Sequence, residues 1–533
     1  MKALIHISAA VFIFFLTGLG LGYRHIWQDE AETAERARTI LESGLPRVID
    51  SSGQVSLNSA GREIEEGNLH RYTPWAQFYV GAAGLKFGKF FGLTSDESLR
   101  LPFALAHALT SSLISFGLNS YALVPLPVSF AVALLFGVQT NRILHNRTAR
   151  YHSLIDLFLM LGLLCIGAFR HERQWAKLLL ALSIFFLPQF HTLGGSLMSL
   201  MLAAIFGIVL FFSYKREKFY LWFKYAAVPG LLALISLLAL TRPWRQEAWG
   251  VLNSGYLLRS ISNKSGIRYS LDFMFICGIF LLFMKEKKLV KSIFLILVIL
   301  VGASALLDFH PFSQARYYFS IPLLCILWPV ALGFGNLEKS RRSIIMILMC
   351  VFIVGPEFTT REHKPFQGLK IAISDFNHEG TKQPLHSAFD MIRAGGTVGD
   401  SVLVDYVPHF ANWYLPGYKI ALLPDISAKT KLNVNNPVWD RPLQMPKWHL
   451  WYPTFGTGPW TCMGHCDYFA HDLVKSKYLL TSQKLERTIS MCVVGRWKTS
   501  RYNNAPFEMM KAASFNPEGD LTDELVLAKP CPK

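Results

Sequence analysis

The chain has 533 residues, of which 52% are hydrophobic and only 17% are charged. A soluble domain carries about 25% charged residues, so the composition excludes an ordinary soluble enzyme and indicates a chain that lies largely in lipid. The formal net charge of +17 comes from 53 Lys and Arg against 36 Asp and Glu. Most of these cations lie in short stretches between apolar runs, where they orient a chain in a bilayer, so they do not indicate nucleic-acid binding.

The first apolar run, residues 3–22, is long enough to cross a bilayer as a helix, and no signal-peptide cleavage site follows it. With the N-terminus in the cytoplasm, the compactly basic loops fall on the cytoplasmic side. The sequence predicts a polytopic α-helical protein of the cytoplasmic (inner) membrane with about eleven spans. The further expected spans lie near 102–118, 122–138, 151–169, 177–190, 192–213, 225–241, 269–284, 292–307, 317–335 and 343–355.

The first outer segment, residues 23–100, begins with the acid pair Asp29 and Glu30. Partial desolvation at a membrane surface raises the pKa of a carboxylate, which makes it a better base. The other interpretation is that these acids cap a helix over 30–43, which we expect to lie in the membrane surface with its apolar face. A second helix, which ends near Gly92, has aromatic residues typical of the headgroup region.

The outer segment 139–150 breaks the charge rule because it contains Arg142, Arg147 and Arg150. A cationic loop on the side that membrane topology disfavours indicates an anionic ligand. The alternative is that a single loop departs from a statistical rule.

After residue 356 the sequence becomes polar, with turn residues and short strand-like runs at 401–407 and 419–424. These features predict a soluble extracytoplasmic α/β domain over 356–533, which follows a transmembrane domain over 1–355. Four cysteines of this domain can form two disulfides in an oxidising compartment, with the pairing left open: Cys462, Cys466, Cys492 and Cys531. Four others lie in apolar runs and are expected to be inert: Cys165, Cys277, Cys325 and Cys350.

Several short motifs occur in an order that resembles a known family. They are Asp29-Glu30-Ala31 after the first span, Tyr72-Thr73-Pro74-Trp75, Ser98-Leu99-Arg100-Leu101-Pro102, Ala149-Arg150-Tyr151 and Ala315-Arg316-Tyr317. Together they resemble the GT-C class of lipid-linked-sugar glycosyltransferases, and more narrowly the superfamily of protein mannosyltransferases and aminoarabinose transferases. That family commonly has His-Pro-Pro where this chain has Tyr72-Thr73-Pro74.

The resemblance implies a GT-C fold and an inverting transfer of a sugar from a polyprenyl-phosphate donor to an acceptor at the outer face of the membrane. It assigns the base role to Asp29, with Glu30 as its helper or as a metal contact. We expect the donor phosphate to be bound by Arg150, Tyr151, Arg316, Tyr317 and Arg147, because a guanidinium binds phosphate oxygens with two parallel hydrogen bonds. Candidate substrate or metal contacts are His191, Arg100 and His70.

The expected partners are the polyprenyl-phosphate donor, a lipid, glycan or protein acceptor, and membrane lipids, with no nucleic acid. No cofactor is expected other than a divalent metal ion, for which the sequence is undecided. Two other functions stay open: a transporter or flippase of an anionic lipid-linked substrate, and a non-catalytic glycan-binding subunit. A transporter predicts ionisable or Gly/Pro-broken positions near mid-span, whereas this chain concentrates its ionisable groups at the outer ends of its spans.

Overall fold

The computed structural model describes two compact units, each assembled from several segments of the chain. The first unit comprises Met1–Leu21, Arg71–Val80 and Arg100–Ile373, and the second comprises Gly22–His70, Gly81–Leu99 and Ser374–Lys533. The predicted boundary at residue 356 separates a transmembrane domain from an extracytoplasmic one. The two units are defined by contacts within the chain and not by their position in a membrane, so this boundary stays a prediction. The described residues are 2–48, 50–51, 67–71, 73–169, 171, 173–213, 219–241, 350, 353, 357–358, 365–378, 384–404, 408–422, 451–452, 461–462, 478–481, 491–499 and 523–530.

The first unit is helical in its described part. Each predicted span between residues 3 and 241 contains a helix, because long apolar runs satisfy their backbone polar groups within the segment. The runs 269–284, 292–307 and 317–335 lie outside the described residues, as do all but two residues of 343–355, so the count of about eleven spans stays a prediction. The helices are α1 (Lys2–Gly18), α5 (Ser95–Ser120, whose first turn belongs to the second unit), α6 (Leu126–Gly137), α7 (Thr140–Asn146), α8 (His152–Phe169), α9 (Trp175–Phe190), α10 (Thr192–Ser213), α11 (Tyr220–Trp222), the π-helical turn η2 (Phe223–Ala227) and α12 (Val228–Thr241).

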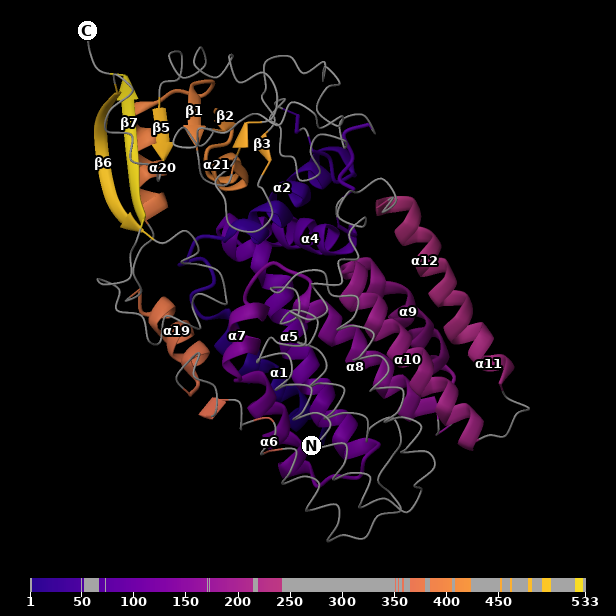
Figure 1. Cartoon of the computed structure of the whole chain (residues 1–533). Coiled ribbons are helices and arrows are strands. Elements are labelled where there is room, and N and C mark those ends of the chain that lie inside the picture. Colours follow the sequence, from indigo (N-terminus) through magenta and orange to yellow (C-terminus); the bar gives the residue numbers. More distant parts are fainter. Residues whose placement is uncertain are drawn as a thin grey trace, which may run out of the picture. The chain divides into compact units, whose positions relative to one another are not determined.

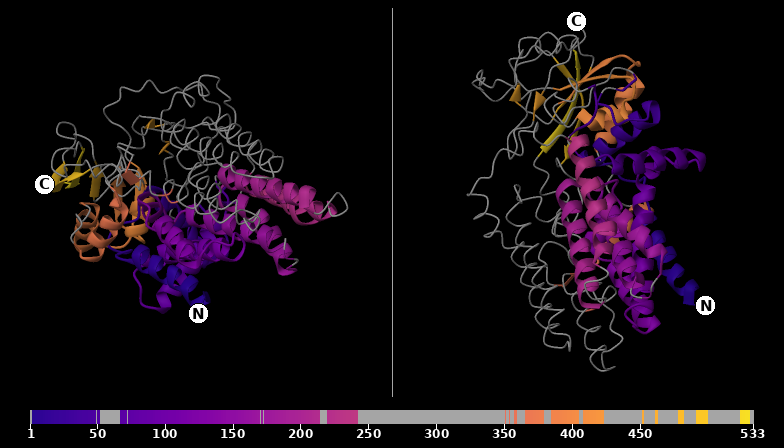
Figure 2. Two further views of the ribbon diagram at one scale, coloured as in Figure 1. Left: turned by 90° about the horizontal axis from the view of Figure 1, so that it is seen from below. Right: turned by 90° about the vertical axis from the view of Figure 1, so that its right-hand side faces the viewer.

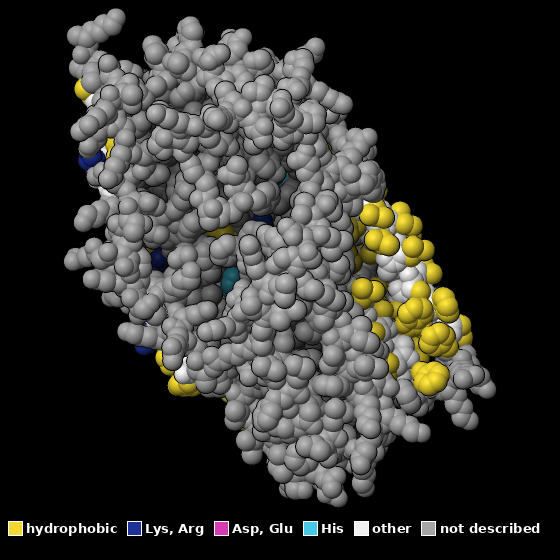
Figure 3. Space-filling view, viewed as in Figure 1, with side chains coloured by type: hydrophobic (Ala, Val, Ile, Leu, Met, Phe, Trp, Pro, Cys, Tyr) yellow, Lys and Arg dark blue, Asp and Glu magenta, His cyan; other side chains and the backbone are white. Residues whose placement is uncertain are grey.

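Within the described part of the chain, four helical segments are long and apolar enough to cross a membrane: Ser95–Ser120, His152–Phe169, Gly194–Phe211 and Tyr220–Thr241. Helices α6 and α7 pass the same test only as a pair, with a bend of 63° between them. The exposed side chains of α12 are also consistent with contact with lipid. This helix exposes apolar side chains such as Leu231 and Ile235, visible as the yellow strip over it in Figure 3. These features are those of a polytopic membrane protein.

Helix α9 is at the centre of one group of helices, where it packs against α8, α10 and α12, as Figure 1 and the turned views of Figure 2 show. Gly195 permits a close approach between α9 and α10, because a Cβ atom at this position would lie 1.9 Å from the carbonyl oxygen of Leu187. Phe169 of α8 packs edge-to-face against Phe206 of α10, with ring centroids 5.2 Å apart.

The second unit contains a five-stranded sheet in the order β2-β1-β5-β7-β6. Strand β1 runs parallel to β2 and β5, whereas β7 runs antiparallel to β5 and β6. The described residues of the two predicted strand-like runs, 401–404 and 419–422, therefore lie in a mixed sheet. The strands are β1 (Ser401–Val404), β2 (Lys419–Leu422), β3 (Trp451–Tyr452), β4 (Thr461–Cys462), β5 (Tyr478–Thr481), β6 (Met491–Thr499) and β7 (Asp523–Pro530). The helices are α2 (Gln28–Ser43), α20 (Pro384–Gly395) and α21 (Pro408–Tyr414), with parts of α4 (Ala76–Phe90) and α19 (Gln367–Phe376).

Helix α2 corrects one expectation. It begins and ends close to the predicted residues, but it does not expose an apolar face to a membrane, because α21 packs against it. Ala31, Ala34 and Ala37 are fully buried. The polar side is buried as well, including Glu30 and Arg36. The prediction that this helix lies in the membrane surface is therefore wrong, and its amphipathic pattern serves packing inside a protein unit.

The described cysteines follow the predicted division. Cys165 and Cys350 are free, whereas Cys492 of β6 is disulfide-bonded. The remaining cysteines, with the side chain of Cys462, lie outside the described residues.

Candidate functional site

The junction between α7 and α8 brings together three of the predicted phosphate-binding residues. Arg147 caps the C-terminus of α7, where a cation interacts favourably with the helix dipole, and its Nη2 donates a hydrogen bond to the carbonyl oxygen of Leu19 over 2.5 Å. The guanidinium carbon of Arg150 lies 5.4 Å from the ring centroid of Tyr151. Arg147, Arg150 and Tyr151 are all buried.

Three histidine rings surround this junction. The ring of Tyr151 lies 4.2 Å from that of His191 and 4.4 Å from that of His152, centroid to centroid. His145 lies 4.9 Å from His152. The structure thus places the predicted His191 at the arginine junction, together with His145 and His152, which the sequence analysis did not select.

His191 lies between α9 and α10, directly before the first residue of α10. Its Nδ1 accepts a hydrogen bond from the backbone N–H of Gly194 over 3.0 Å, so Nδ1 is unprotonated and Nε2 carries the proton in the neutral ring. This capping bond fixes the orientation of the imidazole beside Tyr151.

Arg100 is held near the end of α1. Its Nη1 donates to the carbonyl oxygen of Leu21 over 2.6 Å, two residues after the carbonyl that accepts from Arg147. Both acceptors are backbone carbonyl oxygens, and these bonds orient the two guanidinium groups. Oriented arginines in a buried setting are suited to hold a phosphate.

The segment 139–150 differs from the predicted loop, because most of it is helix α7. Arg142 forms a buried ion pair with Asp156 of α8, so it is a structural residue and not part of a cationic loop. Glu357 binds the N-terminus of α7 by accepting from the backbone N–H and the hydroxyl of Thr140, over 2.8 and 2.7 Å. Helix α7 is therefore fixed at its start and along its length before it presents Arg147.

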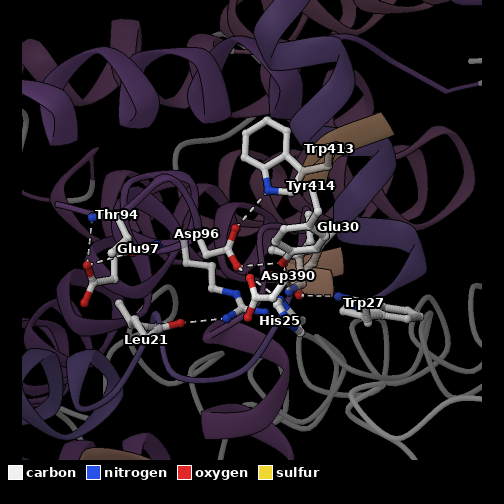
Figure 4. A network of polar contacts seen from close by, with 12 residues as sticks. Leu21, His25, Trp27, Glu30, Thr94, Asp96, Glu97, Asp390, Trp413 and Tyr414 are labelled. Carbon is white, nitrogen blue, oxygen red and sulfur yellow. Dashed lines mark hydrogen bonds and ion pairs between the residues drawn. The ribbon is translucent and has the colours of Figure 1, made fainter. Parts of the chain in front are cut away.

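In the second unit, the predicted acids begin helix α2. Asp29 lies in the first turn of α2, and its side chain is outside the described residues. Glu30 is fully buried and accepts a hydrogen bond from the backbone N–H of Trp27 over 3.1 Å, as Figure 4 shows. Glu30 therefore caps the helix, in agreement with the capping interpretation.

His70 lies beside α2, where it is fully buried. Its Nδ1 accepts from Nε of Arg36 over 3.2 Å, which places the proton of a neutral imidazole on Nε2, 3.5 Å from Oε1 of Glu32. An adjacent guanidinium disfavours a metal cation here. No group of three or more His, Cys, Asp or Glu side chains in the described part of the chain is arranged to hold a metal ion, and the divalent metal stays a prediction.

Glu35 of α2 is the acid with the most perturbed environment. Burial raises its pKa from 4.5 to about 7, against the attraction of Arg38 and Arg36. Its Oε2 accepts from Nη2 of Arg38 over 2.7 Å, and the same nitrogen donates to Asp50 over 2.9 Å. The sequence prediction missed this cluster, because the acid at position 35 looks like a residue of the solvated face.

Arg316 and Tyr317 lie outside the described residues, so their predicted contact with the donor phosphate stays a prediction.

No protein-family model matches the sequence, and a comparison with curated proteins finds no match. Among solved structures, the chain is similar to ArnT from Cupriavidus metallidurans in the apo state, with a TM-score of 0.47 and 12% identity over 99% of both chains. It is also similar to ArnT from the same organism bound to undecaprenyl phosphate, with a TM-score of 0.46 and 14% identity over 99% of both chains. Both scores and both identities are too low to assign the chain to a family.

Proposed function

We propose that this chain is a membrane glycosyltransferase that transfers a sugar from a polyprenyl-phosphate donor to an acceptor at the outer face of the cytoplasmic membrane, with inversion at the anomeric carbon. The observation that carries the proposal is the junction of α7 and α8, where Arg147 and Arg150 are buried and oriented at the end of an apolar helical bundle. Such a junction can hold a lipid-linked phosphate while the isoprenoid chain stays in the bilayer.

The arginines have a defined task in this reaction. The bond between the anomeric carbon and the phosphate oxygen breaks, and the phosphate leaves with the electron pair. Arg150 and Arg147, with Arg316, stabilise the negative charge that develops on this leaving group, and Tyr151 and Tyr317 position it. One well-placed electrostatic donor contributes about 3–4 kcal/mol to the stabilisation of a transition state.

Asp29 is the proposed base. As the acceptor oxygen attacks the anomeric carbon, its proton passes to the carboxylate of Asp29, while Glu30 holds the helix start that carries Asp29. The motif order in the sequence supports this role. The disulfide of Cys492 supports an oxidising, extracytoplasmic location for the C-terminal part.

The proposal is tested in cells that lack the protein and are supplied with wild type, Asp29→Asn or Glu42→Gln, the last being a control that neutralises an exposed acid on the same helix. Mass spectrometry of envelope lipids and glycans should show one saccharide with wild type and Glu42→Gln, and its loss together with accumulated donor with Asp29→Asn. An envelope that is the same with and without the protein would overturn glycosyl transfer. Full product with Asp29→Asn would overturn the base role alone.

The phosphate role has its own measurement, the binding of undecaprenyl phosphate to the purified protein. Arg150→Gln should weaken binding about tenfold or more, the equivalent of one charged hydrogen bond, whereas Asp29→Asn should bind as wild type does. Arg173→Gln is the control, because it removes an exposed arginine. Equal affinities for wild type and Arg150→Gln would contradict the phosphate role.

A further inference from the structure

The connector between α1 and α2 is held by residues from the C-terminal part of the second unit. Nε of Arg24 forms an ion pair with Asp375 over 2.6 Å, and the hydroxyl of Tyr23 donates to the carbonyl oxygen of His378 over 3.0 Å. A connector that only joins two helices does not require such anchoring at successive residues. The next residues, His25 and Ile26, lead into α2 and hence to Asp29.

Tyr414, the last residue of α21, contacts both His25 and Ile26. Its hydroxyl accepts a hydrogen bond from the backbone N–H of Ile26 over 3.0 Å and donates one to Oδ2 of Asp96 over 2.6 Å. Asp96 also accepts from Nε1 of Trp413 over 2.9 Å. Figure 4 shows Trp413 and Tyr414 converging on this carboxylate from the same helix.

Two ring contacts complete the arrangement. The ring of His25 lies edge-on to that of Tyr414, with centroids 4.4 Å apart, and its Nδ1 lies 3.9 Å from Oδ2 of Asp96. The ring of Tyr414 also stacks on that of Phe389 of α20, with centroids 5.5 Å apart. Tyr414 therefore links the entry of α2 to helix α20 of the C-terminal part.

We infer that Tyr414, fixed by Asp96 and Trp413, is a positioning residue that holds the start of α2 in place for the reaction. The inference rests on the proposed function, in which Asp29 is the base. The backbone N–H that Tyr414 binds lies three residues before Asp29, so the hydrogen bond fixes the path on which the helix begins. Accurate placement of a reacting group matters, because a misplacement of about 1 Å can lower a rate on the order of 10²-fold.

The test compares Tyr414→Phe, which removes the hydroxyl and keeps the ring, with Tyr418→Phe. Tyr418 is a buried tyrosine nearby in the sequence, and no described hydrogen bond involves its hydroxyl. In hydrogen–deuterium exchange of the purified full chain, Tyr414→Phe should raise the exchange rate of amides 22–31 about tenfold, as expected for loss of one to two net hydrogen bonds. Tyr418→Phe should leave these amides as in wild type.

The second readout separates rate from binding. Tyr414→Phe should lower formation of the saccharide that Asp29→Asn abolishes, about tenfold or more, while its affinity for undecaprenyl phosphate and its thermal unfolding midpoint stay close to those of wild type. A merely structural role would lower the midpoint as well. If Tyr414→Phe fails to fold, Asp96→Asn serves instead, since it keeps the shape of the side chain and weakens the same contacts.

Unchanged exchange of amides 22–31, or product formation equal to that of wild type, overturns the inference. Equal losses in Tyr414→Phe and Tyr418→Phe also overturn it, because they show general damage to the domain. Full product with Asp29→Asn would overturn the base role of Asp29 and not the inference about Tyr414. In that case the exchange measurement alone decides whether Tyr414 holds the start of α2.

Discussion

Replacing Glu35 by Gln should change how the stability of this protein depends on pH. Glu35 is buried in α2, and its Oε1 has no hydrogen-bond partner within the described chain. Its Oε2 shares one nitrogen of Arg38 with Asp50. Burial raises the pKa of this carboxyl from 4.5 to about 7 in the folded chain, because neither the attraction of Arg38 nor that of Arg36 offsets the lost hydration.

The sign follows from proton binding. Between about pH 4.5 and 7 the folded state holds a proton on Glu35 that the unfolded state has lost, so the free energy of unfolding falls as the pH rises through this window. One pKa unit corresponds to about 1.4 kcal/mol, and the rise from 4.5 to about 7 therefore corresponds to at most about 3.5 kcal/mol. The amide introduced by Glu35→Gln is permanently neutral and similar in shape to the protonated acid, so the variant avoids this loss.

The assay is the thermal unfolding midpoint of the purified protein in detergent, measured for wild type and Glu35→Gln from pH 4.5 to pH 8. The two midpoints should be close at the acidic end, and Glu35→Gln should be the more stable protein above pH 7. Glu42→Gln, at an exposed position on the same helix, should show a difference from wild type that varies far less with pH, because Glu42 contributes least to the raised pKa of Glu35. A difference for Glu35→Gln that varies no more with pH than this control would refute the reasoning from burial.

Two further substitutions test packing in the helical unit. Asp156→Asn leaves the guanidinium of Arg142 buried without its ionic partner and should destabilise the protein by about 3–5 kcal/mol, measured as a lower unfolding midpoint; an unchanged midpoint would contradict a structural ion pair. Gly195→Ala should cost about 1–3 kcal/mol because the new Cβ would lie 1.9 Å from the carbonyl oxygen of Leu187. Gly18→Ala is its control, since no atom lies within 4 Å of that Cβ, and equal midpoints for these two variants would argue against close packing of α9 on α10.

The apolar helices could be predicted from the sequence because their signals are local. The run predicted at 192–213 is α10, from Thr192 to Ser213, and the run at 151–169 is α8 to within one residue. The end of α2 was equally readable, since Gly44 adopts a left-handed conformation with φ 77° and donates to the carbonyl oxygen of Ile40 over 2.8 Å. Glycine followed by Leu-Pro is a local stop signal.

The surroundings of α2 could not be predicted in the same way, because its partners are distant in the sequence. His70 contacts Arg36 across 34 positions, and Tyr414 contacts Ile26 across 388 positions. Without these partners, a helix with alanines on one side and charges on the other has the pattern of a helix at a membrane surface. The amphipathic pattern of α2 was identified correctly, but the predicted environment was wrong, because α21 and not a membrane covers the helix.

The cationic segment 139–150 shows which part of the candidate site a sequence can reveal. Three arginines counted alike there, and the adjoining apolar run holds one acid, since Asp156 lies in the second turn of α8. An isolated acid in an apolar run needs a cation, so the sequence indicates that one arginine of the segment is paired, and the structure identifies it as Arg142. The remaining pair, Arg147 and Arg150, has a neutral carbonyl group and an aromatic ring among its described contacts. The acid in the apolar run therefore reduces three candidate arginines for an anion site to two, but only the fold determines that these two are Arg147 and Arg150.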